Sequence, residues 1–322
     1  MIVIVSMVYK RIWRFDGVEM PFLTYLLFNL ELLLGLLICS MVFVGSKWRR
    51  VVYDDILGRM LDILTIFQNL NLGFKLDLLG HLCIKLLIFT GILFVCIIVV
   101  DATHYMEFIK SAVGFGAYLI PHIVQITCSL QYVFVLTFAY QKFKTINNFL
   151  MSSQHVLRLN VNNNVGTLKA LREQHMLLHQ LAFKVNQHFG LFNIATVILV
   201  VTAISTTCLE VYQNIQLSDR GLYLVYSVLW VVLHGFKLIL ILYPNFLMEN
   251  ERNFTGALLH EYTPYTNTKN DIELKVFLRQ IIHQKGPYTA CGIIPLNLTI
   301  IANILGALAT FLIILILFDQ KP

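Results

Sequence analysis

Long apolar stretches alternate with polar segments along this chain, and each stretch has about the length of a membrane span. A helix needs about 20 mainly apolar residues to cross the hydrocarbon core of a bilayer. The stretches that meet this requirement before the C-terminal part are residues 22–44, 82–101, 114–139, 190–212 and 222–246. The pattern therefore predicts five membrane-spanning helices, followed by one more apolar stretch near the C-terminus.

That last stretch, residues 288–318, is too long for one straight span, and it contains Gly292 and Pro295. Proline removes a backbone donor and breaks a helix. We expect a short helix, a break near Pro295 and then a full span from Asn297 to Phe318. The sequence thus predicts an all-α membrane protein, a multi-span helical bundle with six visible spans.

Lys and Arg are concentrated in three of the segments that connect the predicted spans. Segments 45–81, 140–189 and 247–287 carry five, six and five of them, whereas the alternate loops and the C-terminal tail carry one each. Cytoplasmic loops are enriched in Lys and Arg, so these three segments are predicted to be cytoplasmic and the C-terminus outside. Six spans then put the N-terminus outside too, although residues 1–20 carry three basic residues. We therefore expect a further span upstream of Met1.

Two of the basic segments contain amphipathic patterns. Within residues 166–188, Leu168, Leu171 and Leu178 recur at helical spacing, and residues 271–284 show a weaker pattern of the same kind. Each pattern leads straight into a predicted span. We expect the spans to continue as helices into the cytosol and to pack together there.

Composition supports a membrane protein and excludes several functional classes. Hydrophobic residues make up 57% of the chain and charged residues 13%, which is about half the charged fraction of a soluble domain. The net charge of +6 is not gathered into a basic cluster with aromatic residues, so no nucleic-acid partner is expected. His175 and His179 have a metal-ligand spacing but no further ligand nearby, and the chain lacks dense histidine clusters. We expect no metal, no cofactor and no enzymatic activity.

The segment from Glu251 to Gln320 resembles the C-terminal signature region of insect gustatory receptors. It begins with ERNFTG at 251–256 and continues with YTACGIIPL at 288–296. A weaker similarity is NQHFG at 186–190, since the family often has an Asn before a Phe-Gly entry into its fifth span.

The family's closing motif is Thr-Tyr, five hydrophobic residues and Gln-Phe. Here Thr310-Phe311 and Leu317-Phe318 enclose five hydrophobic residues, so the spacing is the same. Thr310 and Phe318 match the motif, whereas Phe311 replaces Tyr and Leu317 replaces Gln.

The resemblance implies a helical bundle of the insect chemoreceptor type, with seven spans and the C-terminus outside. It agrees with the predicted topology if the family's first span is missing here. It implies a tetrameric, ligand-gated, nonselective cation channel that senses a small chemical in taste perception, in the plasma membrane of a sensory neuron. Its partners would be a small-molecule tastant, cations, membrane lipid and gustatory receptor subunits of a homo- or hetero-tetramer.

The resemblance also divides the chain into four parts. These are an N-terminal segment 1–21, five spans with cytoplasmic extensions and an outer ligand pocket in 22–246, a cytoplasmic anchor region 247–296, and a pore-lining last span with a short outer tail in 297–322.

The last span carries a stripe of mainly small and polar residues on one helical face, formed by Thr299, Asn303, Gly306, Thr310, Ile314 and Leu317. Close helix packing or a water-filled path would explain it. The resemblance favours pore lining by Thr310, Ile314, Leu317 and Phe318, whereas Thr299, Asn303 and Gly306 are expected at the inner pore face or in packing. Leu317 offers hydrocarbon where the family has an amide. Either the chain conducts poorly alone or depends on partner subunits that supply the amide, or the site tolerates both residues.

Two helical faces that combine aromatic and polar side chains are candidates for a ligand pocket. They are formed by Tyr118, His122 and Gln125 on the third visible span, and by Tyr226, Trp230 and His234 on the fifth. Such groups suit a small amphipathic ligand. The alternative is an interfacial aromatic belt, which is strongest for Tyr226.

Two charged residues, Glu31 and Lys237, lie within predicted spans. A charge inside a membrane is costly and indicates function by default. Lys237 is expected to extend toward the cytosol, whereas no partner for Glu31 can be named from the sequence.

Two further interpretations remain open. One is a non-conducting accessory or interaction protein of the same fold, which Leu317 favours. The other is a transporter or a G-protein-coupled receptor. The predicted outside C-terminus argues against such a receptor, and the absence of an internal repeat argues weakly against a transporter.

Overall fold

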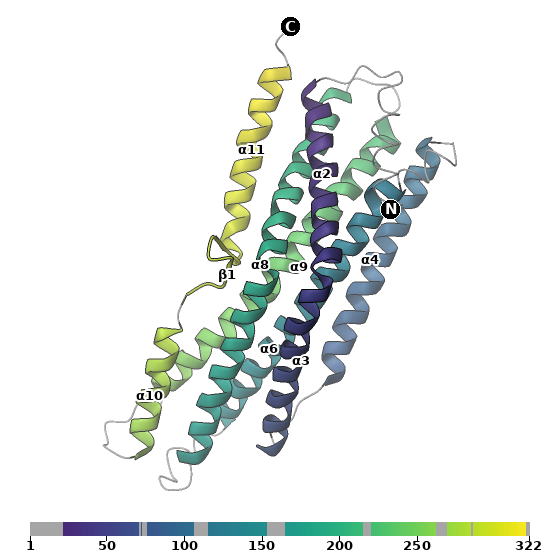
Figure 1. Cartoon of the computed structure of the whole chain (residues 1–322). Coiled ribbons are helices and arrows are strands. Elements are labelled where there is room, and N and C mark those ends of the chain that lie inside the picture. Colours follow the sequence, from purple (N-terminus) through teal and green to yellow (C-terminus); the bar gives the residue numbers. More distant parts are fainter. Residues whose placement is uncertain are drawn as a thin grey trace.

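The computed structural model shows an elongated bundle of long helices (Figure 1). It describes residues 22–70, 72, 76–105, 115–152, 165–214, 220–261, 269–284 and 286–319. Within these ranges six helices are long and apolar enough to cross a membrane, which confirms the predicted number of spans.

The six helices keep the predicted order along the chain. They are α2 (Phe22–Val44), α4 (Leu76–Tyr105), α6 (Ile120–Ser152) preceded by the π-helical turn η1 (Phe115–Leu119), α8 (Val165–Asn214), α9 (Arg220–Glu261) and α11 (Thr299–Asp319). Helix α6 packs along α9, and α8 packs against α2, α6 and α9. The predicted amphipathic helix 166–188 is confirmed, because α8 runs through it and its span as one helix of 50 residues.

Two shorter helices, α3 (Ser46–Asn69) and α10 (Lys269–His283), lie at the end of the bundle away from the C-terminus (Figure 1). Helix α3 occupies most of the segment 45–81, for which we predicted no helix. Its apolar residues Ile56, Ile63 and Phe67 fall on one face and are buried. The helix therefore forms by packing rather than by spanning a membrane.

The segment between α10 and α11 differs from the prediction. Instead of a short helix it contains an antiparallel pair of strands, β1 (Thr289–Ala290) and β2 (Ile294–Pro295). Cys291 and Gly292 adopt positive φ angles of 52° and 75° at the turn, a conformation incompatible with a continuing right-handed helix. Helix α10 therefore does not lead straight into a span, and the short helix expected before Pro295 is absent from this described segment.

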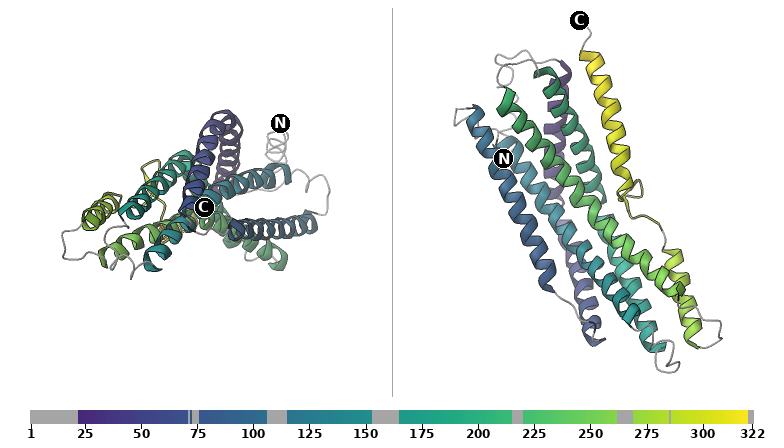
Figure 2. Two further views of the ribbon diagram at one scale, coloured as in Figure 1. Left: turned by 90° about the horizontal axis from the view of Figure 1, so that it is seen from below. Right: turned by 180° about the vertical axis from the view of Figure 1, so that it is seen from behind.

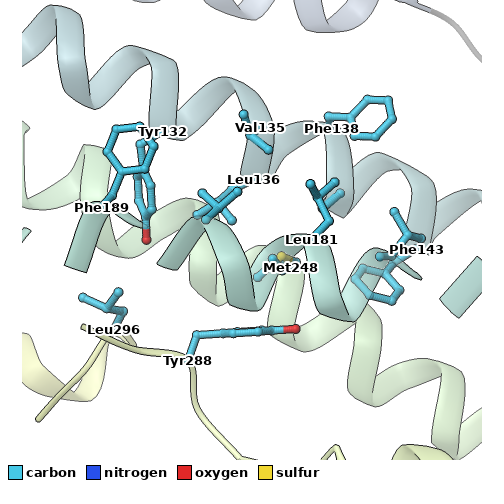
Figure 3. Close-up of a cluster of buried hydrophobic side chains, with 14 of the residues drawn as sticks. Tyr132, Val135, Leu136, Phe138, Phe143, Leu181, Phe189, Met248, Tyr288 and Leu296 are labelled. Carbon is cyan, nitrogen blue, oxygen red and sulfur yellow. The ribbon is translucent and has the colours of Figure 1, made fainter. Parts of the chain in front are cut away.

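The linker between α10 and α11 (described at residues 284 and 286–298) is packed onto the long helices. The backbone N–H of Leu296 donates to the carbonyl of Tyr288 over 2.8 Å, and this bond closes the base of the hairpin. Both side chains are buried. Figure 3 shows them facing the core formed by side chains such as Leu136, Leu181 and Met248.

A buried polar triangle connects the three central helices. Tyr132 of α6 donates to Oδ1 of Asn186 over 2.6 Å, Asn186 of α8 donates to Oδ1 of Asn245 over 3.1 Å, and Asn245 of α9 donates to Tyr132. All three side chains are buried. Because a polar group in an apolar interior needs a partner, this triangle favours one alignment of α6, α8 and α9.

Candidate functional site

A buried polar cluster lies where α2, α6 and α9 meet. We refer to Glu31, His122, Gln125, His234 and Lys237 as the intramembrane cluster. All five side chains are buried, and Glu31 is the most exposed at 8%. These residues lie far apart in the sequence, and packing of α6 along α9 brings them together.

Aromatic rings extend the intramembrane cluster along α9. The ring of His122 contacts Trp230 and His234 with centroid distances of 5.1 Å each, and Trp230 stacks on His234 at 5.7 Å. Tyr226 contacts Trp230 at 5.9 Å. Five of the six pocket candidates, which the sequence places on two separate helices, therefore form one continuous group.

Lys237 does not extend toward the cytosol as we expected. Its ammonium group is fully buried, donates to Oε1 of Gln125 over 2.7 Å and lies 2.8 Å from Nδ1 of His122. Glu31 lies in the same cluster and supplies a charge of opposite sign. A buried charge needs partners of this kind because its desolvation is costly.

Several polar atoms at the intramembrane cluster lack a hydrogen-bond partner among the described residues. They are Nε2 of His122, Nε2 of Gln125, Oγ of Ser129 and both ring nitrogens of His234. Leaving such a group buried without a partner costs about 1–3 kcal/mol. The arrangement therefore favours a bound polar group that would satisfy these atoms.

The stripe on α11 faces away from the other described helices. All six of its residues are exposed, and Leu317 reaches 59%. The opposite face, with Ile300, Ile304 and Leu315, is buried against the bundle. Helix α11 stands along α8 at the edge of the molecule (Figure 2). Packing among the described residues thus leaves the stripe uncovered.

The linker between α10 and α11 is held by residues of two long helices. Arg252 of α9 donates to the carbonyl of Gly286 over 2.9 Å, and its guanidinium lies 4.9 Å from the ring centre of Tyr288. The phenol oxygen of Tyr288 lies 2.8 Å from Nδ1 of His179 in α8. Burial raises the pKa of Tyr288 to about 12, so its hydroxyl stays protonated at neutral pH.

The comparisons with known proteins agree with this architecture. The chain matches the family described as 7tm chemosensory receptor over residues 1–322. The chain belongs to the 7tm chemosensory receptor family. A similar protein is the gustatory receptor for sugar taste 43a of Drosophila melanogaster, which is 27% identical over 158 residues. The aligned part covers 48% of this chain and 36% of that receptor, so the match spans about a third of the relative's length.

Membership of the chemosensory receptor family confirms the resemblance seen in the sequence. It also supports the expectation of a receptor for a chemical ligand, in a family that is not one of enzymes. For two of the candidate site residues the structure does not describe the side chain. The side chain of Tyr118, in η1, and that of Phe318, near the end of α11, lie outside the described residues.

The histidine pair with metal-ligand spacing has a different role in the receptor. His175 is buried between the rings of Phe143 and Phe277, at 4.9 and 5.4 Å, and His179 contacts Tyr288. Within the described ranges no third donor joins this pair, and the His/Cys/Asp/Glu group that could hold a metal contains Glu31, His122 and His234 instead.

A separate hollow lies at the other end of the receptor, between α3 and α8. It has a volume of about 640 Å³ and is lined by residues that include Asp55, Asp62 and Leu177. Asp55 pairs with Lys184 and Arg59, and these cations lower the pKa of its carboxyl group. This hollow is lined by charged residues and is open to solvent. The aromatic group around Trp230 therefore resembles a small-molecule pocket more closely.

Sequence reasoning missed the burial of two cations in this receptor. It placed Lys142 and Arg252 in cytoplasmic loops, the latter within the signature stretch 251–256, whereas both side chains are buried and Lys142 lies 4.3 Å from the ring centre of Phe67. The signal that could have predicted their burial is that α6 and α9 continue as helices past their apolar stretches. A cation on the packed face of such a helix is buried and needs a partner.

Proposed function

We propose that this receptor is a subunit of a tetrameric, ligand-gated, nonselective cation channel in the plasma membrane of a sensory neuron. The observation that supports the proposal best is the uncovered stripe of α11, which runs from Thr299 to Leu317. A mainly apolar helix with one polar face needs either water or another protein surface on that face. Four copies around a central axis would supply both.

The ligand in this proposal is a small molecule with several hydrogen-bonding groups, bound at the intramembrane cluster and its aromatic neighbours. The atoms without partners at His122, Ser129 and His234 favour such a molecule over a purely apolar one. The similar Drosophila receptor is named for sugar taste, which makes sugars the first compounds to test. Binding would move α6 and α9 and, through α8, the helix α11 that contacts it.

Subunit counting tests the assembly without knowledge of the ligand. We expect single-molecule photobleaching of tagged chains at the cell surface to give predominantly four steps. The same cells should then show a cation current when sugars are screened. Single bleaching steps from correctly delivered chains would contradict the tetramer.

Replacing Leu317 with Gln tests the placement of α11. If Leu317 lines the constriction, its hydrocarbon side chain keeps water out of the pore, whereas an amide would admit water and ions. Agonist-evoked current should then rise several-fold. Leu305→Gln is the matched control, because Leu305 is 61% exposed and lies roughly 120° around the helix from Leu317.

The readout is current per surface-expressed subunit, measured by voltage clamp and surface labelling. Equal currents for Leu317→Gln and the original chain would place Leu317 outside the pore. A chain that stays silent but raises the current of a co-expressed receptor would favour the accessory role instead.

A further inference from the structure

We propose that Glu31, His122 and His234 form a binding site for a zinc ion inside the helical bundle. Each residue offers one donor atom, and the three donors lie within 4.8 Å of one another. They come from three different helices, α2, α6 and α9. The sequence predicts no metal site, because nothing in the spacing of these residues indicates that they meet.

The positions of the three donors and the unpaired histidine nitrogens suit a metal ion. Around a tetrahedral ion with bonds of about 2.0–2.1 Å, neighbouring donors lie about 3.4 Å apart, so small side-chain rotations would close the site. Two imidazoles on one such ion have ring centres about 5 Å apart, and those of His122 and His234 are 5.1 Å apart. Nε2 of His122 and both nitrogens of His234 are buried without a hydrogen-bond partner among the described residues.

Neighbouring side chains would orient the ligands. Metal-bound histidines usually use their second nitrogen for a hydrogen bond that fixes the ring. Nδ1 of His122 lies 2.8 Å from Nζ of Lys237, which in turn donates to Gln125. This contact restricts the ring of His122, and when Nε2 binds the metal, Nδ1 carries the ring proton and donates it to the nitrogen of Lys237, which must then be the neutral amine. Trp230, stacked on His234, limits rotation of the second ring.

The donor set selects the kind of metal. Two imidazole nitrogens and one carboxylate form a set used by zinc enzymes, with a fourth position left for water or another ligand. Calcium and magnesium prefer oxygen ligands, of which this site offers one residue. A charged Lys237 would repel any cation at the site, so zinc requires Lys237 as the neutral amine, and the carboxylate of Glu31 supplies a negative charge that attracts the ion. Zinc is therefore the ion that fits best.

A bound zinc ion would connect α2, α6 and α9 at the proposed ligand pocket. Because it would occupy the polar atoms that are free for an organic ligand, zinc should compete with the tastant. The site itself does not depend on the channel proposal, since zinc binding can be measured on the isolated receptor.

Direct binding to the purified full chain tests the proposal. After removal of metals by a chelator, we expect calorimetry to detect one zinc ion per chain. His234→Ala and Glu31→Gln should each weaken binding by about 100-fold or more, since even second-shell changes cost 10- to 100-fold. His81→Ala is the control, because His81 is exposed on α4 and should bind as the original chain does.

Cobalt provides a measurement on the unaltered protein. Co²⁺ in a four-coordinate site with two histidines should give visible absorption bands that zinc removes. Absence of these bands and of zinc binding at millimolar metal would overturn the proposal. The proposal would also be overturned if His81→Ala and His234→Ala lost equal affinity for zinc, because zinc would then bind at surface histidines.

Discussion

Replacing Arg252 with Ala is expected to destabilise the receptor by about 3–5 kcal/mol, the range measured when one partner of a buried charged group is removed. The Arg252 side chain is 1% exposed. It donates to the carbonyl of Gly286, lies over the ring of Tyr288 and is 3.7 Å from the carboxylate of Glu249. Alanine would remove all three interactions and leave a cavity between α9 and the linker.

The measurement is thermal unfolding of the purified chain in detergent, together with the fraction that reaches the cell surface. Arg279→Ala is the control, because Arg279 is exposed on α10 and its loss should change the melting temperature little. The melting temperature of Arg252→Lys should lie between those of Arg252→Ala and Arg279→Ala, since lysine keeps the charge but not the planar guanidinium group. A melting temperature for Arg252→Ala equal to that of the original chain would contradict the role of Arg252.

The membrane-spanning helices could be predicted because each apolar stretch has the length of a span. The cytoplasmic part of α8 could be predicted because apolar residues recur at helical spacing in 166–188. Helix α3 was missed because it is too polar to span a membrane. Its buried residues Ile56, Ile63 and Phe67 have helical spacing, so a search for amphipathic faces in 45–81 would have found it.

The hairpin before α11 and the intramembrane cluster were less accessible to sequence reasoning. Pro295 was rightly taken as a break, but the sequence does not specify that Thr289 pairs with it. Glu31 and His234 meet because α2, α6 and α9 cross at one level of the bundle, and crossing level depends on the packing of entire helices. The two faces chosen on α6 and α9 did prove to be adjacent, because both combine aromatic and polar residues that avoid lipid.

The linker that leads into α11 is held by contacts with both α8 and α9. Arg252 of α9 and His179 of α8 hold its first half through Gly286 and Tyr288. The turn at Cys291 packs on α8 at Gly190. We therefore expect a movement of α8 or α9 to reach the start of α11 through this linker, so that substitutions in the linker contacts should alter the response of the receptor.

Gly190→Ala is accordingly expected to disturb the linker. A Cβ atom at position 190 would lie 2.8 Å from the backbone nitrogen and from Sγ of Cys291, closer than such atoms approach. The hairpin would have to shift, at a cost of about 1–3 kcal/mol that is typical of overpacking. Cys291 cannot yield easily, since it already has a positive φ of 52°. We expect delivered receptors to lose most of their response to ligand, because α11 begins eight residues after this turn.

Gly91→Ala is the matched control for this change. Gly91 lies within α4, no atom of the described residues comes within 4 Å of the position of its Cβ, and alanine favours the helix there. The double variant Gly190→Ala/Cys291→Gly should recover part of the response, because it removes the sulfur contact and the strained φ but keeps the contact with the backbone nitrogen. Agonist-evoked current per surface receptor measures all three. A Gly190→Ala receptor with normal current would show that the hairpin can move without affecting α11.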